Sequence, residues 1–349
     1  MQRVFGQFLK QIQKTQDKAI KQAEKSQKVN IQEFHYNDSP PKMIAIDGSN
    51  RWIWYNPDLD VRIAIIRVAY VIYEYQKEAQ QPLILREQDC KDYSSLIAPN
   101  NPDIHNYDLM TKKLHMGIQG VIGRRPRARN ILALLRTLRE FELAEELAWK
   151  HKNSLIVIDG ALTFVQVKEY EDAILSLRKA CQNNRNILIG ISKRNKTRRL
   201  GSSLTDEAVV REMTRNNSNM LFAEIQAIPK VQQLFPTLGK TFLAKLHTKP
   251  VKTFRVDIDM PDGVDVKEIF SHLSYYSMVD SFRGYPFPLV EAHNIAVLLR
   301  RVPDMYNHDL IEAGLELGIE EEELFQHLIT SEKMENDPFH RHLDDITKL

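Results

Sequence analysis

Two short apolar segments of the chain each run directly into an Asp-Gly pair, and this repeat constrains the fold more than any other feature. Met43–Ile46 precedes Asp47, and Ser154–Ile158 precedes Asp159. A short, continuously apolar segment bounded by turn residues is typical of a buried strand. We therefore expect two buried strands, each with a tight turn and an aspartate at its carboxyl end. For either pair alone, the alternative is a turn aspartate that accepts hydrogen bonds only from local amides.

The middle of the chain alternates between helical and strand patterns. Asn130–Lys150 is the clearest helix, because its apolar side chains recur at three- and four-residue steps. The strand before Asp159 follows, and then a helix at Val165–Gln182 and a strand at Asn186–Ile191. Strands that alternate with helices pair in parallel. Parallel pairing would place Asp47 and Asp159 on the same rim of the sheet, where the functional groups of open α/β sheets gather.

The first part of the chain adds an antiparallel meander. Val61–Tyr75 is rich in β-branched and aromatic residues, and Pro82–Arg86 is a second strand pattern. We expect residues 86–126 to be a long polar insertion with one helix near Tyr107–Val121. Residues 1–29 are expected to be an amphipathic helix whose apolar face packs on the body or, as the alternative, on a partner. Further helices are predicted at Thr205–Asn216, Val266–Val279, Leu289–Arg300 and after Asn307, and further strands at Lys240–Leu246 and Thr253–Ile258.

No linker-like segment divides the chain, so the pattern favours one catalytic body with insertions. We predict an N-terminal helix and linker at residues 1–40, an α/β domain at residues 41–305 and a C-terminal helical extension at residues 306–349. Two distant cysteines are typical of a reducing compartment. Charges interrupt the longest apolar segment before it reaches the roughly 20 residues of a membrane span. We therefore expect a soluble, cytoplasmic protein that does not enter a membrane.

The charge balance and the missing motifs exclude several function classes. The chain carries 48 basic and 46 acidic side chains, so any affinity for nucleic acid must come from local clusters of charge. The sequence has no phosphate loop, no Gly-x-Gly-x-x-Gly fingerprint and no Ser-x-x-Lys element. ATP hydrolysis, nicotinamide binding and serine acyl transfer therefore lack support.

The two aspartates predict a divalent metal site. Neighbouring carboxylates repel one another unless a cation lies between them, and hard oxygen ligands suit magnesium and manganese. The helix before Asp159 offers further carboxylates, among which spacing on the helix does not select one: Glu140, Glu142, Glu145 and Glu146. His293 lies in an apolar helical segment, where it is either a ligand or a core histidine whose hydrogen bonds are satisfied.

Two basic segments flank the predicted acidic rim and favour a polyanionic substrate. The DNA-binding candidates in these segments are Arg124, Arg125, Arg127, Lys193, Arg194, Lys196 and Arg198. The aromatic turn just before His293 contains Tyr285 and Phe287. These two rings are either wall residues of the site or platforms on which an unpaired base stacks.

An ordered set of landmarks across most of the chain resembles the NurA family of DNA nucleases. The landmarks are Ile46-Asp-Gly-Ser49, the acidic helix, Val157-Ile-Asp-Gly-Ala161, Ile191-Ser-Lys193 and Gly284-Tyr-Pro followed by Glu-Ala-His293. The resemblance implies an α/β fold: an RNase H-like mixed sheet flanked by helices, with helical insertions and a helical C-terminal region. Ala161 departs from the family pattern, in which a serine is more usual.

The resemblance also implies an activity and a set of site residues. It implies a manganese-dependent deoxyribonuclease, with magnesium as an alternative ion, that acts 5′ to 3′ on single- and double-stranded DNA and as an endonuclease on single strands. It implies a homodimer that works with a hexameric HerA-type ATPase in DNA end resection and repair. The metal ligands and catalytic residues carried over from the family are Asp47, Glu142, Asp159 and His293, with Lys193 as a further catalytic residue. Glu142 is selected among its neighbours by the family's spacing alone.

Two other function classes remain open at this point. The chain could be a catalytically inactive RNase H-like module that only binds DNA or the ATPase. It could also be a small-substrate metal phosphohydrolase that uses the same acidic centre. Metal-dependent cleavage of DNA would distinguish the nuclease from the inactive binding module. A salt-dependent affinity for DNA would distinguish it from the phosphohydrolase.

Overall fold

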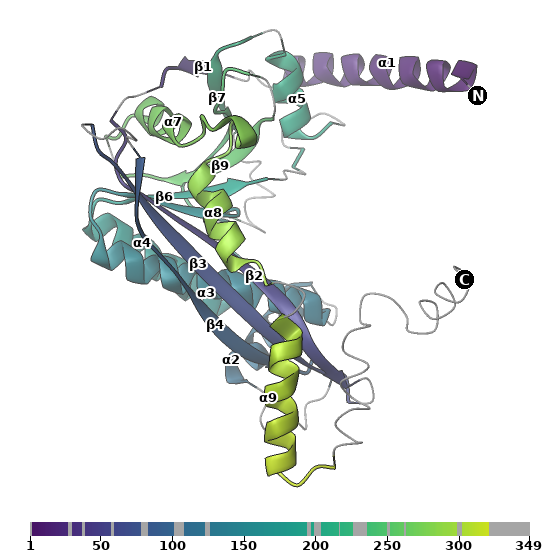
Figure 1. Ribbon diagram of the computed structural model, residues 1–349. Helices are drawn as coiled ribbons and strands as arrows, with labels where there is room; N and C mark the ends of the chain where they lie inside the picture. Colours follow the sequence, from purple (N-terminus) through teal and green to yellow (C-terminus); the bar gives the residue numbers. More distant parts are fainter. Residues whose placement is uncertain are drawn as a thin grey trace.

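The computed structural model places a long mixed sheet at the centre of the molecule (Figure 1). It describes residues 2–26, 30–36, 39–56, 59–77, 83–100, 108–122, 126–193, 197–198, 204–215, 217–225, 236–249, 252–261, 263–298 and 302–320. Within these residues the sheet has nine strands in the order β1-β7-β8-β9-β6-β5-β2-β3-β4. The strands are β1 (Ile31–Phe34), β2 (Met43–Asn56), β3 (Val61–Tyr75), β4 (Leu83–Ile97), β5 (Leu155–Asp159), β6 (Ile187–Ser192), β7 (Met220–Glu224), β8 (Lys240–Lys245) and β9 (Phe254–Asp259).

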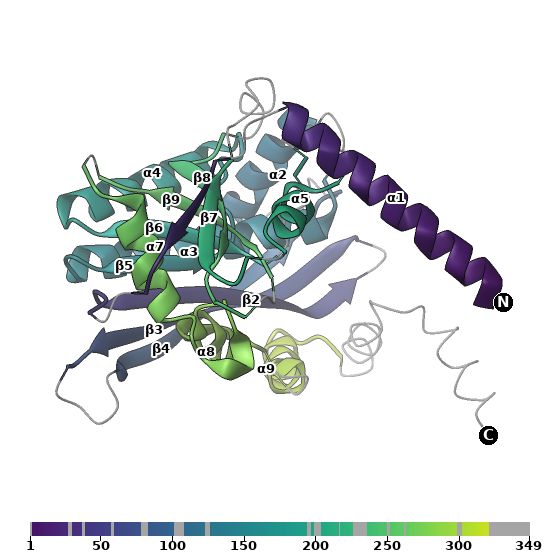
Figure 2. The same ribbon diagram turned by 90° about the horizontal axis from the view of Figure 1, so that it is seen from above.

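Helices cover both faces of this sheet (Figure 2). They are α1 (Gln2–Ser26), α2 (Leu109–Ile122), α3 (Ala128–Lys150), α4 (Lys168–Asn183), α5 (Asp206–Met213), α7 (Val266–Tyr275), α8 (Phe287–Ala296) and α9 (Val302–Glu316), with a short 3-10 helix at Asp280–Phe282. The α2, α3 and α4 helices pack on one face, whereas α7 and α8 pack on the other.

Five strands form the RNase H-like core that the resemblance implies. Strands β2, β3 and β4 are an antiparallel meander. After α3, β5 returns beside β2 in parallel, and after α4, β6 pairs in parallel with β5. In order of their appearance in the chain, these strands lie 3-2-1-4-5 across the sheet. The predicted mixed α/β sheet is therefore confirmed.

The continuously apolar pattern of the central strands follows from burial on both faces. Along β2, Ile44 and Ile46 enter the cluster beneath α3, whereas Met43 and Ala45 enter the cluster beneath α8. Successive side chains of a strand point to opposite faces, so a strand covered on both sides is apolar at every position. Asp47 is next in this alternation and therefore points to the α8 face.

The first Asp-Gly pair does not form the turn that the sequence predicts. Strand β2 continues to Asn56, and Asp47 pairs with Ala69 of β3. The strand continues because β3 is as long as β2 or longer and supplies backbone partners along it, with one irregularity between Trp52 and Trp54. The neighbour on the other side is shorter, since β5 pairs only with Met43–Ile46. Asp47 thus lies within a strand, at the point where β2 passes the end of β5.

Other predicted boundaries differ from the structure for similar reasons. The long polar insertion starts later than predicted, because β4 extends to Ile97 as the exposed outer strand of the meander. The predicted helix near Tyr107–Val121 is present as α2. Strands β1 and β7 were not predicted. They are only 4 and 5 residues long and pair with each other at the far side of the sheet.

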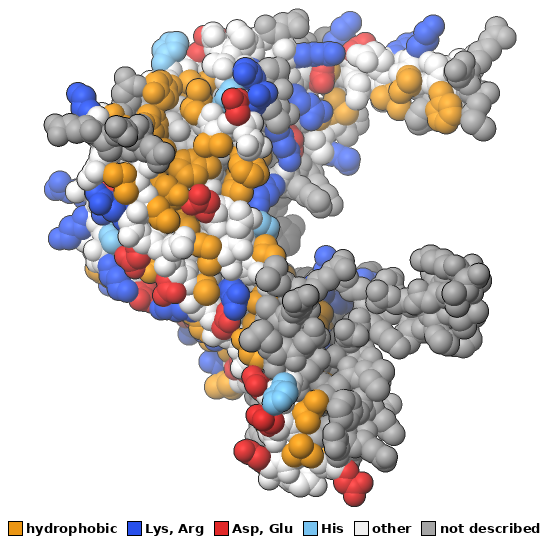
Figure 3. Space-filling model, viewed as in Figure 1, with side chains coloured by type: hydrophobic (Ala, Val, Ile, Leu, Met, Phe, Trp, Pro, Cys, Tyr) orange, Lys and Arg blue, Asp and Glu red, His pale blue; other side chains and the backbone are white. Residues whose placement is uncertain are grey.

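The apolar side chains of the N-terminal helix that the structure describes do not pack on the body. Helix α1 contacts α5 and extends away from the sheet, with apolar side chains on its surface (Figure 3). Phe5 and Leu9 remain 59% and 63% exposed. The expectation of packing is therefore wrong for these side chains. Among the helices that the structure describes, none combines the length and the apolar character needed to cross a membrane.

Candidate metal centre

Three of the predicted ligands converge from three separate elements. Asp47 of β2, Asp159 of β5 and His293 of α8 each offer one ligand atom, and these atoms all lie within 4.8 Å of one another. His293 Nδ1 lies 2.6 Å from Asp47 Oδ2. The other oxygen of Asp47 accepts a hydrogen bond of 2.8 Å from the backbone N–H of Gly48. A local hydrogen bond to a backbone amide was the alternative role for Asp47. The structure contains both this bond and the contact with His293.

The alternation of the two parallel strands explains this convergence. Leu155 and Val157 of β5 belong to the cluster on the α8 face, so Asp159 points to that face as well. Asp159 is the last residue of its strand, and its neighbour β2 carries Asp47 just beyond their last paired residues. Helix α8 crosses the same face and brings His293 to the rim.

The electrostatics of Asp47 suit a cation. Its side chain is almost fully buried, and burial raises the pKa of its carboxyl. The nearby charge of Asp159 raises this pKa further, while His293 and Lys193 lower it. Two carboxylates in one buried site resist joint ionisation, and a bound cation relieves that repulsion.

Glu140 of α3 is the helical glutamate whose charge the two aspartates influence, although its carboxylate is not part of the cluster of Asp47, Asp159 and His293. Glu140 is 1% exposed. Its Oε1 lies 3.3 Å from Arg136 Nε but has no partner with hydrogen-bond geometry among the described residues. The pKa of Glu140 is raised to about 8, chiefly because of burial. The charges of Asp47 and Asp159 contribute to the rise, whereas Arg136 and the backbone N–H of Gly48 oppose it.

Glu142 lies outside this cluster. Its carboxylate forms an ion pair of 2.7 Å with Arg139, and its side chain is 37% exposed. The structure therefore does not bring the predicted helical ligand to the centre. The sequence does hold a signal for Glu140, which precedes the buried Leu143 and Ala144 by three and four residues and thus lies on the packed stripe of α3.

Lys193 completes the charged groups of the rim. Its Nζ lies 2.5 Å from Asp159 Oδ2, and its side chain is 43% exposed. The same ammonium group lies 5.2 Å from the centre of the Tyr285 ring. Lys193 follows the end of β6, which pairs with β5, and this pairing explains the contact with Asp159.

Tyr285 is a wall residue of the centre and not a platform for a base. It is 6% exposed and packs against Phe254 with the ring centres 5.3 Å apart. Burial raises the pKa of its hydroxyl well above the usual range, and the charges of Asp159 and Asp47 add to this effect. Phe287 likewise packs edge-on against Tyr73, with the ring centres 4.8 Å apart. Base stacking on the buried face of Tyr285 is therefore excluded in this conformation.

The predicted basic segments are described only in part. Arg124, Arg125, Arg194 and Lys196 lie outside the described residues. Arg127 just before α3 and Arg198 are described, and both are exposed. Their contact with DNA stays a prediction.

The donor set fits a divalent ion of the manganese or magnesium type. Two carboxylates and an imidazole from three elements surround one position, and such oxygen and nitrogen donors suit these ions. The buried carboxyl of Asp47, whose pKa is raised by burial and by the charge of Asp159, is a group that a cation would stabilise in its charged form.

Comparisons with known proteins agree with the sequence landmarks. Residues 41–298 match the NurA domain, and a search of curated proteins finds no match. The NurA nuclease from Sulfolobus solfataricus is similar in structure, with 19% identity, 92% of this chain and 99% of that chain covered, and a TM-score of 0.55. A NurA structure with manganese has 10% identity, coverage of 85% and 94%, and a TM-score of 0.44. The catalytic domain of human endonuclease V has 10% identity, coverage of 82% and 94%, and a TM-score of 0.38.

The structural likeness at these identities is a likeness of fold, whereas the domain match rests on the sequence itself. That match covers most of the chain and includes Asp47, Asp159 and His293. The chain therefore belongs to the NurA family.

Proposed function

We propose that this protein is a metal-dependent deoxyribonuclease whose active site is the rim formed by β2, β5, α3 and α8. The observation that carries the proposal is the convergence of Asp47, Asp159 and His293 on one position beside the buried Glu140. The similar protein from Sulfolobus solfataricus is described as a nuclease, and a second NurA structure is described with manganese. DNA is therefore the expected substrate class.

Asp47, Glu140, Asp159 and His293 are the proposed metal ligands. Manganese is the expected ion, and magnesium suits the same donors. A divalent ion at this position would supply a water of lowered pKa and neutralise charge on the phosphodiester. Glu140 takes the place of Glu142 in this proposal, because Glu140 is buried and feels the charges of both aspartates, whereas Glu142 is paired with Arg139.

The remaining residues of the rim bind and orient the substrate. Lys193 reaches the centre through a half-exposed side chain, so its ammonium group can leave Asp159 and contact a non-bridging phosphate oxygen. Tyr285 keeps its proton, since its pKa is far above neutrality, and its ring closes the wall beneath Lys193. Glu140 holds a proton near neutral pH when no cation is present, and binding a cation releases that proton.

The proposal is tested with Asp47→Asn and Asp159→Asn in a manganese-dependent assay on end-labelled DNA. Both variants should lose cleavage while they keep the melting temperature of the unaltered protein within a few degrees. Removal of manganese with a chelator should abolish cleavage by the unaltered protein. Undiminished cleavage by well-folded variants would exclude these residues as ligands. Cleavage of a small phosphate ester but not of DNA would favour the phosphohydrolase instead.

The finer properties of the family remain part of the proposal. They are 5′-to-3′ degradation of single- and double-stranded DNA, endonuclease activity on single strands, a homodimer, and a role in DNA end resection with a hexameric HerA-type ATPase. Substrates blocked at one end decide the polarity, and a circular single strand tests the endonuclease. Light scattering on the purified protein decides whether it is a dimer. Absence of all DNA cleavage together with retained DNA binding would favour the inactive binding module.

A further inference from the structure

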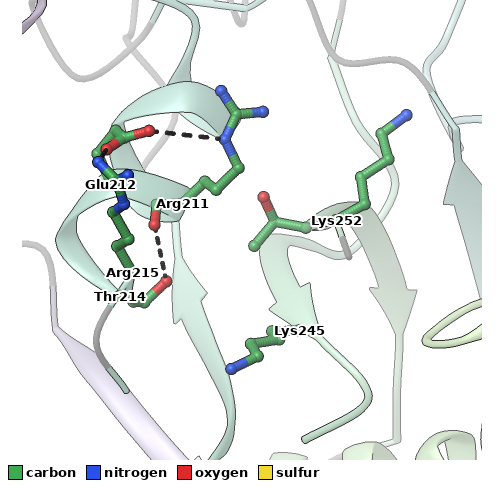
Figure 4. A pocket seen from close by; sticks show the side chains of 7 residues that line it. Arg211, Glu212, Thr214, Arg215, Lys245 and Lys252 are labelled. Carbon is green, nitrogen blue, oxygen red and sulfur yellow. Dashed lines mark hydrogen bonds and ion pairs between the residues drawn. The ribbon is translucent and has the colours of Figure 1, made fainter. Parts of the chain in front are cut away.

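A basic pocket lies outside the proposed metal centre, between α5 and the ends of β8 and β9. It has a volume of about 440 Å³ and is lined by Arg211, Glu212, Thr214, Arg215, Lys245, Lys252 and Thr253. Arg211 and Arg215 come from α5 and the turn that follows it, whereas Lys252 lies on the opposite side (Figure 4). On the face seen in Figure 3, Lys and Arg side chains gather around α5.

The pocket has a marked excess of positive charge. Four cationic side chains share one carboxylate, that of Glu212. Glu212 lies 3.9 Å from Arg211 and 3.7 Å from Arg215, so its contacts with both are loose. One half-buried carboxylate at these distances leaves most of the positive charge unbalanced.

Lys245 is the most informative of these cations. It is 5% exposed, and its ammonium group donates a hydrogen bond of 2.6 Å to the carbonyl of Asn217. No carboxylate pairs with it among the residues that the structure describes. Burial lowers the pKa of its ammonium group. A buried cation without a counter-ion is costly, and an anionic ligand would remove that cost.

The pocket and the proposed metal centre share one edge of the sheet. The ammonium group of Lys252 donates a hydrogen bond to the backbone carbonyl of Lys193, the same residue whose side chain contacts Asp159. Strands β8, β9, β6 and β5 lie in this order across the sheet. Three spacings of about 4.8 Å each separate the strands of Lys245 and Asp159, so the two residues are at least roughly 14 Å apart. Lys245 alternates with Phe242 and Ala244 and therefore lies on the α5 face, so a strand bound at both places passes over this edge of the sheet.

We propose that this pocket binds a phosphate group of the DNA strand whose scissile phosphate lies at the metal centre. The inference rests on the proposed nuclease function and extends it. A stacked strand advances about 3.4 Å per nucleotide, so a separation of at least roughly 14 Å corresponds to at least about four nucleotides. The two arginines supply the planar donors that suit phosphate oxygens, and Lys245 supplies a charge fixed at the base of the pocket. The phosphate is either internal to the strand or a 5′-terminal phosphate.

The proposal is tested by the affinity of the whole protein for a fluorescent single-stranded oligonucleotide, measured with a chelator so that no cleavage occurs. The variants are the surface pair Arg211→Gln with Arg215→Gln, and separately Lys245→Met. The control is the pair Lys152→Gln with Lys179→Gln, exposed lysines near the opposite end of the sheet. The pocket variants should bind about tenfold more weakly, with the slope of log affinity against log salt reduced by about 1.

Further measurements separate the possible outcomes. If only the 5′-phosphorylated oligonucleotide loses affinity, the ligand is the terminal phosphate; equal losses for the 5′-hydroxyl form identify an internal phosphate. Manganese-dependent hydrolysis of a nitrophenyl ester of thymidine 5′-phosphate, which is too short to reach the pocket, should be unchanged in the variants. The proposal would be overturned if the variant with both arginines replaced bound DNA with the affinity and salt slope of the unaltered protein. This test holds even if Lys245→Met fails to fold. Reduced binding by a protein that cleaves nothing would keep the pocket and reject the nuclease.

Discussion

Glu140 occupies the space that a side chain at position 48 would fill. A Cβ atom built on Gly48 would lie 2.6 Å from Glu140 Oε1 and 3.0 Å from Arg136 Cγ. The glycine faces α3, while Asp47 beside it faces α8. The absence of a side chain at Gly48 thus leaves room for the carboxylate of Glu140 against β2, next to the residue that carries Asp47.

This relationship predicts that Gly48→Ala displaces Glu140 and weakens the metal site. Manganese affinity, measured by titration calorimetry, should fall at least about tenfold, because losses around metal ligands cost about 10–100-fold. Gly160→Ala in the second Asp-Gly pair is the matched control, since a Cβ there meets nothing within 4 Å. Equal manganese affinities in the two variants would show that Glu140 does not depend on the space at Gly48.

A second prediction distinguishes the two glutamates of α3. Glu140→Gln should reduce manganese-dependent DNA cleavage at least about tenfold, because it removes the buried carboxylate beside Asp47. Glu142→Gln should leave cleavage near that of the unaltered protein, because it removes only an exposed ion pair with Arg139. The measurement is the rate of DNA cleavage by each variant at saturating manganese. A greater loss in Glu142→Gln would restore the ligand that the family spacing selects.

A third prediction concerns the stability of the metal-free protein between about pH 5 and pH 8. The pKa of Glu140 is raised to about 8 in the folded protein from a usual value of 4.5. Between these values the folded state binds a proton that the unfolded state has lost, so the free energy of unfolding falls as the pH rises. Asp47, whose pKa is also raised, acts in the same direction at the acidic end.

The measurement is the melting temperature in the presence of a chelator at several pH values. The unaltered protein should melt at progressively lower temperature from pH 5 to pH 8, and Glu140→Gln should flatten this slope. Saturating manganese should reverse much of the loss, because the ion binds the deprotonated carboxylate. A slope of the same size in Glu140→Gln would assign the pH dependence to other groups.

A fourth prediction concerns the hydroxyl of Tyr285. Tyr285→Phe keeps the packing against Phe254 and removes a buried hydroxyl whose interaction with Asp159 falls short of good hydrogen-bond geometry. The melting temperature should therefore change by no more than a few degrees. Affinity for single-stranded DNA should not change, because the ring is not exposed to a base. Tyr285→Leu serves as the comparison that also removes the ring. Weaker binding by the leucine variant with unchanged stability would show that the ring stacks on DNA after all.

Local patterns in the sequence determined the central sheet and the two aspartates. Continuous apolar strands and a helix with regular apolar steps depend on neighbouring residues, so β5, α3, α4 and β6 were predicted close to their observed bounds. The parallel pairing that brings Asp47 and Asp159 together follows from the strand-helix-strand order. His293 was expected from the family landmarks, and α8 brings it within 2.6 Å of Asp47.

Contacts between distant segments decided the rest. The choice of Glu140 over Glu142 depends on which side of α3 faces the space above Gly48, and the spacing of glutamates along one helix does not contain that information. The continuation of β2 past Asp47 depends on the length of β3. The basic pocket joins residues of α5, β8 and the start of β9, none of which forms a basic run in the sequence. The sequence by itself therefore determined which strands are buried and which aspartates end up adjacent, because these follow from local periodicity. Only the tertiary structure decided which side chains complete the centre and where positive charge gathers, because both depend on long-range packing across the sheet.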